Sequence, residues 1–244
     1  MPFLPTVRRR LARRMRLRHP TRRIRFRLAL DELDRAFTGA SPVVLDAGCS
    51  EGLLAELVAA RHPDWSIDAV DADADVVKLA AAALAVAGAE NVRTFEADIT
   101  KPLGNELYDA VLAFECLHLI PDDDAVLASL AVATKADGLL LAHVPVRGWV
   151  RVSRIGRTIW PGEVRSGYTP EELTDKLVRA GYRDVGITLT CRSLARFGSE
   201  VDARLAGGLA VLVWWYPISV AMAWLDRHGV TWGPATSFLV RARR

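Results

Sequence analysis

Val43-Val44-Leu45-Asp46-Ala47-Gly48-Cys49-Ser50-Glu51-Gly52 is an apolar run that leads into a turn containing two glycines. Residues 43–47 predict a buried strand, and the segment 53–61 that follows the turn predicts a helix. In such a strand–turn–helix unit, one glycine lets the chain turn tightly beneath a ligand, and another lets the elements pack closely. We expect Gly48 and Gly52 in these two roles. The turn alone is also compatible with an ordinary connection between a strand and a helix.

The rest of the chain alternates between strand-like and helix-like segments. Strands are predicted at 66–71, 92–97, 110–114 and 139–144, and helices at 76–87 and 170–180. A further helix is predicted from the spacing of Phe26, Leu30, Leu33 and Phe37, and Gly39 and Pro42 end it. Segments 184–190 and 237–242 predict two more strands. This order predicts a doubly wound, mostly parallel sheet.

Acidic residues follow several of these strands. Asp71 ends the second strand, Asp98 follows the third, and Glu115 follows the fourth. The carboxyl ends of parallel strands share one edge of the sheet, where ligands bind in this architecture. There, Asp71 is placed to hold ribose hydroxyls and Asp98 to reach the exocyclic amine of an adenine.

These segments resemble a known family as a set. LDAGCSEG, VDAD, FEADI, YDAVLAFECLHLIPD and DGLLLAHVP look like the successive motifs of class I S-adenosylmethionine (SAM)-dependent methyltransferases that act on small molecules. GEVRSGYTPEELTDKLVRAGY resembles a segment of the ubiquinone- and menaquinone-methyltransferase-like members. The resemblance covers about residues 40–192 and returns at 237–244. It implies an α/β, Rossmann-like fold with a seven-stranded, mostly parallel sheet and an antiparallel last strand, with SAM as the cofactor.

The resemblance also implies which residues form the cofactor site. At the methionine end of SAM it places Asp46, Gly48, Cys49, Ser50 and Gly52. It places Asp71 and Ala72 at the ribose, Asp98 and Ile99 at the adenine, and Glu115 beside the cofactor. Ser50 departs from the glycine that the family usually has there, which puts the shape of the turn in question. An NAD or FAD site is the weaker interpretation, because Asp46 and Glu51 make the loop acidic and pyrophosphate needs a site with little negative charge.

Methyl transfer is a direct displacement, so an enzyme has chiefly to align the nucleophile and, where needed, remove a proton. His143 is the first candidate base, because 139–143 carries it to the carboxyl edge of the sheet; the alternative is that it only hydrogen-bonds the pocket wall. His118 and Tyr168 are further candidates, with structural roles as their alternatives. The three cysteines are far apart, so no metal site is expected and a reduced, cytoplasmic protein is favoured.

Residues 1–27 contain eleven arginines and no acidic residue. This arm therefore carries +11 of a total net charge of +3, which leaves the rest of the chain at −8. Val7, Leu11 and Met15 at four-residue steps suit a helix on an anionic membrane surface. Docking onto the chain's own acidic body or a neighbouring subunit is an alternative, as is a solvated helix. The arm offers few aromatic residues for base stacking, so nucleic acid is not favoured.

Residues 205–225 carry no charge, but Pro217 and the glycine pair at 207–208 break the run. If strands 184–190 and 237–242 share one sheet, a single membrane crossing between them is excluded. We therefore expect a bent helical insertion that serves as a lid, a dimer interface or an in-plane membrane contact. The expected organisation is a basic arm (1–38), a SAM-binding domain (39–192), a hydrophobic helical insertion (193–236) and the last strand (237–244).

These observations favour a SAM-dependent methyltransferase that acts on a small lipophilic metabolite such as a quinone, polyketide, terpenoid or lipid. A SAM-binding enzyme of the same fold that catalyses cyclisation or rearrangement is the second hypothesis. A non-catalytic SAM-binding protein or membrane adaptor is the third. The sequence leaves the acceptor atom and the oligomeric state open.

Overall fold

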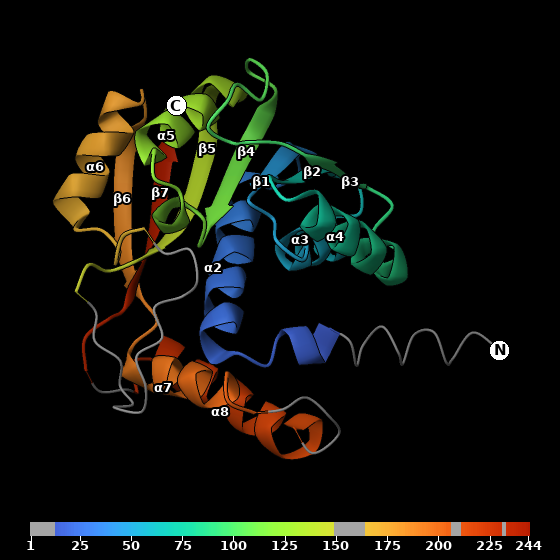
Figure 1. The fold of residues 1–244 in the computed structure, drawn as a ribbon, viewed down its shortest axis with the longest axis vertical. Helices are drawn as coiled ribbons and strands as arrows, with labels where there is room; N and C mark the ends of the chain where they lie inside the picture. The colour runs from blue at the N-terminus through green and yellow to red at the C-terminus, as the bar shows by residue number, and fades with distance from the viewer. Residues whose placement is uncertain (1–12, 149–163, 206–210, 231–232) are drawn as a thin grey trace.

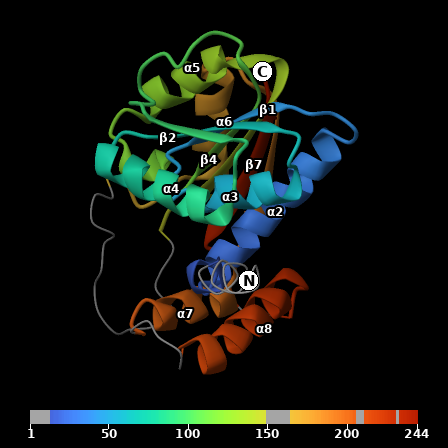
Figure 2. The same ribbon diagram turned by 90° about the vertical axis from the view of Figure 1, so that its right-hand side faces the viewer.

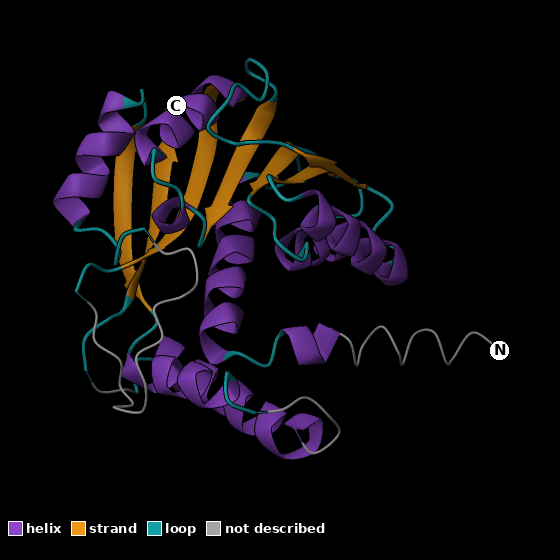
Figure 3. Ribbon diagram, viewed as in Figure 1, coloured by secondary structure: helices purple, strands orange, loops and turns teal. Residues whose placement is uncertain are grey.

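The computed structural model describes residues 13–148, 164–205, 211–230 and 233–244. These residues form a seven-stranded sheet in the order β3-β2-β1-β4-β5-β7-β6 (Figure 1 and Figure 3). The strands are β1 (Val43–Ala47), β2 (Ser66–Asp71), β3 (Val92–Glu96), β4 (Tyr108–Phe114), β5 (Thr134–Pro145), β6 (Arg183–Thr190) and β7 (Ser237–Arg243). β7 runs antiparallel to both of its neighbours, and the remaining pairs are parallel. The predicted Rossmann-like fold with an antiparallel last strand is confirmed.

Helices cover both faces of the sheet (Figure 2). One face packs against α2 (Pro20–Ala36), α3 (Leu53–Arg61) and α4 (Ala74–Ala87), and the other against α5 (Asp123–Ala133) and α6 (Pro170–Arg179). Successive strand residues serve opposite faces: Val44 packs into the first layer and Leu45 into the second, and both are fully buried. Burial on both faces explains why the strands are continuously apolar.

The chain order explains where a ligand site can form. β1 lies between β2 and β4, so the connections from β1 and from β4 leave the sheet in opposite directions. This is the topological switch point at which ligands bind in open α/β sheets. The glycine-containing turn 48–52 begins at the carboxyl end of β1.

A third layer lies beyond the carboxyl edge of the sheet, at the bottom of Figure 1. It consists of α7 (Ser193–Asp202), the π-helical turn η2 (Val211–Trp215) and α8 (Tyr216–Arg227). Ile24 of α2 packs there against Cys191, Ala195 and Ala223. The apolar run 205–225 is thus helical over 211–225, with Pro217 in the first turn of α8 rather than at a break; 207–208 lie outside the described residues. Within the described chain, no helix has the length and apolar character needed to cross a bilayer.

The described part of the basic arm docks onto the chain's own body. Arg16 contacts Glu51 and Glu56, with Nη1 2.6 Å from the Glu56 carboxylate. Arg18 lies 3.0 Å from Asp202 of α7. These contacts match the alternative in which the arm binds its own acidic domain. Of the predicted apolar stripe, Val7 and Leu11 lie outside the described residues.

Candidate active site

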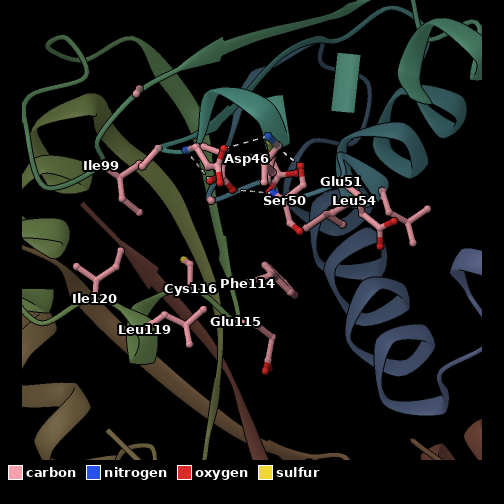
Figure 4. Close-up of a pocket in the computed structure, with 18 of the residues that line it drawn as sticks. Asp46, Ser50, Glu51, Leu54, Ile99, Phe114, Glu115, Cys116, Leu119 and Ile120 are labelled. Atoms are coloured by element: carbon pink, nitrogen blue, oxygen red, sulfur yellow. Dashed lines mark hydrogen bonds between the residues drawn. The ribbon is translucent and has the colours of Figure 1, made fainter. Parts of the chain in front are cut away.

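A pocket of about 690 Å³ opens at the carboxyl ends of β1 and β4 (Figure 4). Its lining includes all the predicted cofactor residues except Gly52: Asp46, Gly48, Cys49, Ser50, Asp71, Ala72, Asp98, Ile99 and Glu115. The remaining lining residues come from α2, the start of α3, α4 and the segment that follows β4. Residues that are distant in the sequence thus meet in one cavity large enough for a drug-sized ligand.

The turn after β1 has the shape that the glycines predict. Gly48 adopts φ +73°, and a Cβ there would lie 2.8 Å from the Cβ of Cys116. Ser50, at the position where a glycine is usual, adopts a left-handed φ of 49°, and its N–H donates to Asp71 Oδ2 at 3.0 Å. The serine therefore keeps the conformation that glycine would allow, and that hydrogen bond ties the turn to β2. Gly52 shapes the turn from outside the pocket, where a Cβ would press on Ala80 of α4 at 3.2 Å.

Asp46 lies at the floor of the pocket, and its side chain is almost fully buried. Its Oδ2 has no hydrogen-bond partner among the described residues. Burial, with a smaller contribution from the charge of Asp71, raises the pKa of Asp46 to about 7 against a hydrogen bond from the Ala55 backbone. A buried carboxylate oxygen without a partner is costly, so this group is suited to a cationic or hydrogen-bond-donating ligand.

Asp71 and Asp98 point their carboxylates along the same edge. Asp71 Oδ1 accepts from the N–H of Asp73 at 3.2 Å, so both of its oxygens are held by backbone amides. Asp98 Oδ1 accepts from the N–H and the hydroxyl of Thr100, and these bonds, the hydroxyl first, lower the pKa of Asp98. Both carboxylates are fixed in direction before any ligand binds.

Glu115 is the polar residue at the opposite side of the cavity, directly after β4. It adopts a left-handed φ of 61°, which is uncommon for a residue with a side chain, and its N–H donates to the carbonyl of His143. Its Oε1 lies 2.5 Å from Nδ1 of His143 and 3.9 Å from Nη1 of Arg25. Burial raises the pKa of Glu115, but the charge of Arg25 and the hydrogen bond from His143 outweigh burial and hold it well below its usual range. Glu115 is therefore an ionised acceptor at the pocket wall.

His143 stands behind Glu115 rather than in the pocket. It is 1 % exposed, and its Nε2 lies 3.0 Å from the hydroxyl of Thr190. Burial lowers the pKa of His143, and the neighbouring Glu115 opposes this only in part. The neutral ring then donates from Nδ1 to Glu115 and accepts at Nε2 from Thr190. This geometry matches the hydrogen-bonding alternative for His143 and leaves no free nitrogen to take a proton from a substrate.

The other two candidate bases also lie outside the pocket lining. His118 is buried in the short 3₁₀ helix η1 (Leu117–Leu119). Tyr168 is fully buried, and its hydroxyl donates to Asp123 at 2.9 Å. Burial raises the pKa of Tyr168 to about 12. Both residues support the walls around the site, and the charge of His118 is a smaller cause of the lowered pKa of Glu115.

Two arginines of the arm are pocket residues that the sequence analysis did not identify. Arg22 and Arg25, with Phe26, contribute the α2 side of the lining. Arg22 Nη1 lies 2.6 Å from Glu51 Oε1, and Nε of Arg25 is buried without a hydrogen-bond partner among the described residues. The helical period placed Phe26 on a buried face, but nothing in the pattern of the arm distinguishes these arginines from the others.

The pocket fits SAM. Orphaned Asp46 Oδ2 suits the positively charged methionine end, and the guanidinium groups of Arg22 and Arg25 suit its carboxylate. Asp71 and Asp98, held by backbone amides, line the same cavity as Ile99, and their assignment to the ribose and the adenine stays a prediction. The absence of a Cβ at Gly48 lets the side chain of Cys116 pack closely against the turn. The described residues contain no cluster of three or more potential ligands placed to hold a metal ion.

Part of the chain matches a known family and known proteins. A family described as a methyltransferase domain matches residues 44–138. An uncharacterized methyltransferase of Mycobacterium tuberculosis (strain H37Rv) is 38 % identical over 109 residues, which are 44 % of this chain and 53 % of the relative. A protein of Mycobacterium bovis matches to the same extent. The chain thus spans about half the length of the curated relatives it matches.

Solved structures show the same fold. The [4+2]-cyclase SpnF superposes with a TM-score of 0.62 at 20 % identity, covering 90 % of this chain and 81 % of that chain. A putative sarcosine dimethylglycine methyltransferase from Galdieria sulphuraria gives 0.61 at 15 % identity, covering 89 % and 83 %. Phosphoethanolamine N-methyltransferase 2 of Haemonchus contortus, in complex with SAM, gives 0.60 at 16 % identity, covering 88 % and 51 %.

The chain has a Rossmann-like fold, and its residues 44–138 match a methyltransferase domain. The acids at the carboxyl edge of that domain line a pocket that fits SAM.

Proposed function

We propose that this protein transfers the methyl group of SAM to a small, lipophilic acceptor. The observation that carries the proposal is the composition of one continuous cavity. Phe114, Leu119 and Ile120 line it together with the acids that fit SAM (Figure 4). Phe114 ends β4, Leu119 and Ile120 come after it, and all three lie away from the turn at Asp46. Such a wall favours an acceptor with a substantial apolar body, such as a quinone, polyketide, terpenoid or lipid.

When bound, SAM supplies an electrophilic methyl group on a sulfonium. The chain's own residues then have to orient the acceptor and keep water out. Ionised Glu115, held by Arg25 and His143, accepts a hydrogen bond from the acceptor or from the cofactor's amino group at the pocket wall. With its pKa held low, Glu115 positions a donor better than it removes a proton. Acceptors that are already acidic, such as a phenol of a quinol, suit this arrangement.

The test is an assay of purified protein with SAM carrying an isotopically labelled methyl group. Quinols, polyphenols and prenylated alcohols serve as acceptors, with glycine and phosphoethanolamine as polar comparisons. We expect label in an apolar product, with one S-adenosylhomocysteine released for each methyl group transferred. Label in the polar acceptors alone would refute the lipophilic class.

A SAM-binding cyclase or rearrangement enzyme is the second candidate. The observation that favours it is that the described lining residues include neither an imidazole nor a phenol, so the pocket offers no obvious base. Product mass distinguishes the two reactions, because cyclisation gives an isomer of the substrate and releases no S-adenosylhomocysteine. A protein that binds SAM with neither outcome over the same panel would fit the third candidate, a non-catalytic SAM-binding protein.

A further inference from the structure

The outer face of α8 is apolar, although it is turned to solvent. Trp214 is 75 % exposed, Trp224 57 % and Ile218 51 %, and Pro217 and Ala221 between them are exposed as well. These positions recur at helical spacing, so they form one stripe along η2 and α8. The opposite face, with Ser219, Ala223 and Asp226, is buried against the rest of the molecule. The amphipathic helix is thus packed by its small and polar residues and exposes its large ones.

The charge exposed along η2 and α8 is basic. Asp226 is the single acidic residue of 211–230, and it is buried and accepts from the backbone N–H groups of Arg192 and Ala195. At the N-terminal end of α8, the guanidinium groups of Arg14 and Arg23 lie 5.7 and 4.9 Å from the ring centre of Tyr216. At the other end, Arg227 is exposed and pairs with Asp31 at 2.6 Å. The arm that approaches Tyr216 contributes further arginines and no acid.

We propose that the stripe formed by Trp214, Pro217, Ile218, Ala221 and Trp224 binds in the plane of an anionic lipid bilayer. Exposed tryptophans suit the boundary between headgroups and acyl chains, and arginines beside them suit anionic headgroups. A second copy of the chain is disfavoured as the occupant, because a symmetric contact through this face would bring two arms of like charge together. Nucleic acid is disfavoured as well, because its charged backbone would not bury the apolar side chains of the stripe.

The position of α8 relates the proposed membrane contact to the SAM pocket. Ile24 packs against Ala223 on the inner face of α8, and the adjacent residues Arg25 and Phe26 line the SAM pocket. The stripe lies on the outer face of α8, so α8 itself and α2 separate it from the cavity, a thickness of about 20 Å. A lipid-soluble acceptor that leaves the bilayer would therefore have to pass only two helix diameters to reach the pocket. The membrane proposal does not depend on methyl transfer, because lipid binding is measured without cofactor or acceptor.

The experiment is co-sedimentation of the full chain with phosphatidylcholine vesicles, with and without phosphatidylglycerol, together with tryptophan emission. We expect binding to the anionic vesicles, a blue shift of emission, and much weaker binding to the neutral ones. The double variant Trp214→Ala/Trp224→Ala should bind at least about tenfold more weakly. Arg14→Glu should weaken binding at low salt and less so at high salt. Leu79→Ala/Val178→Ala, which truncates exposed apolar residues of α4 and α6, is the matched control and should bind like the wild type.

Binding to anionic vesicles that the tryptophan variant retains in full would overturn the proposal, as would no binding by the wild type. Sedimentation velocity gives the other contrary outcome, a dimer that the same variant dissociates, which would assign the stripe to a second copy. Thermal unfolding and SAM binding of the variant should match the wild type, because both tryptophans are exposed. If they do not, Ile218→Glu replaces the double variant, and the same criteria apply.

Discussion

Nδ1 of His143 lies 2.5 Å from Oε1 of Glu115, so a buried neutral ring holds an ionised carboxylate against the wall of the SAM pocket. The imidazole is saturated by Glu115 on one side and Thr190 on the other. It acts on the site through Glu115, as a positioning residue. This relationship and its neighbours lead to four predictions.

His143→Ala should destabilise the fold strongly. The change leaves Glu115 and Thr190 without a shared partner and opens a cavity beside Phe114, whose ring stacks at 5.9 Å. We expect the free energy of unfolding to fall by about 3 kcal/mol or more. His228→Ala, at an exposed histidine, is the control and should cost less than about 0.5 kcal/mol. Urea-induced unfolding measures both, and equal small losses would contradict the role assigned to His143.

Asp46 should give the apo protein an unusual dependence on pH. Its pKa is about 7 in the folded chain against 3.8 for an exposed carboxyl, so the folded state holds a proton that the unfolded state has released. The contribution of Asp46 to stability is therefore complete below about pH 4 and falls, by up to about 4 kcal/mol, as the pH rises to about 7. Above that pH the contribution is constant. Asp46→Asn removes the effect.

Denaturation of wild type and Asp46→Asn across this pH range isolates the contribution of Asp46, because all other carboxylates are common to both. The difference in unfolding free energy should shift in favour of the variant as the pH rises. SAM affinity of the wild type should increase over the same range, since a cationic ligand favours ionised Asp46. A difference that does not vary with pH would refute a raised pKa.

Gly48 and Gly39 offer a matched pair, since both adopt φ +73°. Alanine at Gly39 meets no atom within 4 Å, so it should cost only the backbone strain, about 1 kcal/mol. Alanine at Gly48 meets Cys116 Cβ at 2.8 Å as well and should cost about 1–3 kcal/mol more. It should also weaken SAM binding, measured by calorimetry. Equal costs and unchanged SAM affinity for both variants would contradict the close approach at the turn.

Arg22→Ala tests whether the arm belongs to the cofactor site. Removing the guanidinium takes a cation from the pocket lining and releases Glu51 of the cofactor turn. We expect SAM affinity to fall by about tenfold, the equivalent of about 1.4 kcal/mol. Arg27→Ala removes an arginine of the same helix whose partner is Asp31 and which does not line the pocket. If both variants lose SAM affinity to the same extent, the loss reflects the net charge of the arm, and a specific role of Arg22 in the pocket is refuted.

The sequence predicted some elements to the residue and missed others for physical reasons. β1, α3 and β2 have the predicted bounds because apolar runs and glycines delimit them clearly. The sequence did not predict α5. Most of its residues are buried, Val126, Leu127, Leu130 and Ala131 among them, so its sequence shows no alternation between an apolar and a polar helix face. α2 begins at Pro20, earlier than predicted, because proline suits the first turn of a helix and the apolar period starts only later.

In the site, the order of strands along the chain was enough to predict where the acidic residues lie, but not where His143, Arg22 and Arg25 lie. Asp46, Asp71 and Asp98 reach the pocket because each stands at or just past the end of a parallel strand. His143 was expected at the same edge, but β5 continues to Pro145 and pairs at His143 with Phe114 and Leu239, which keeps the ring inside the sheet. Arg22 and Arg25 enter the pocket through tertiary docking of the arm, which no local pattern encodes.

β7 has a consequence for how this molecule is made. It is the latest of the described strands in the chain, yet it lies between β5 and β6. While the ribosome is still adding residues before 237, β6 therefore has no neighbour with which to pair, and one flank of β5 stays open. Until residues 237–243 have been made, only β1 to β5 can assemble, and the sheet is then completed by inserting β7 between β5 and β6. Pairing of strands that are distant in sequence is slow, and until β7 is inserted the chain exposes unpaired strand edges that are prone to aggregation.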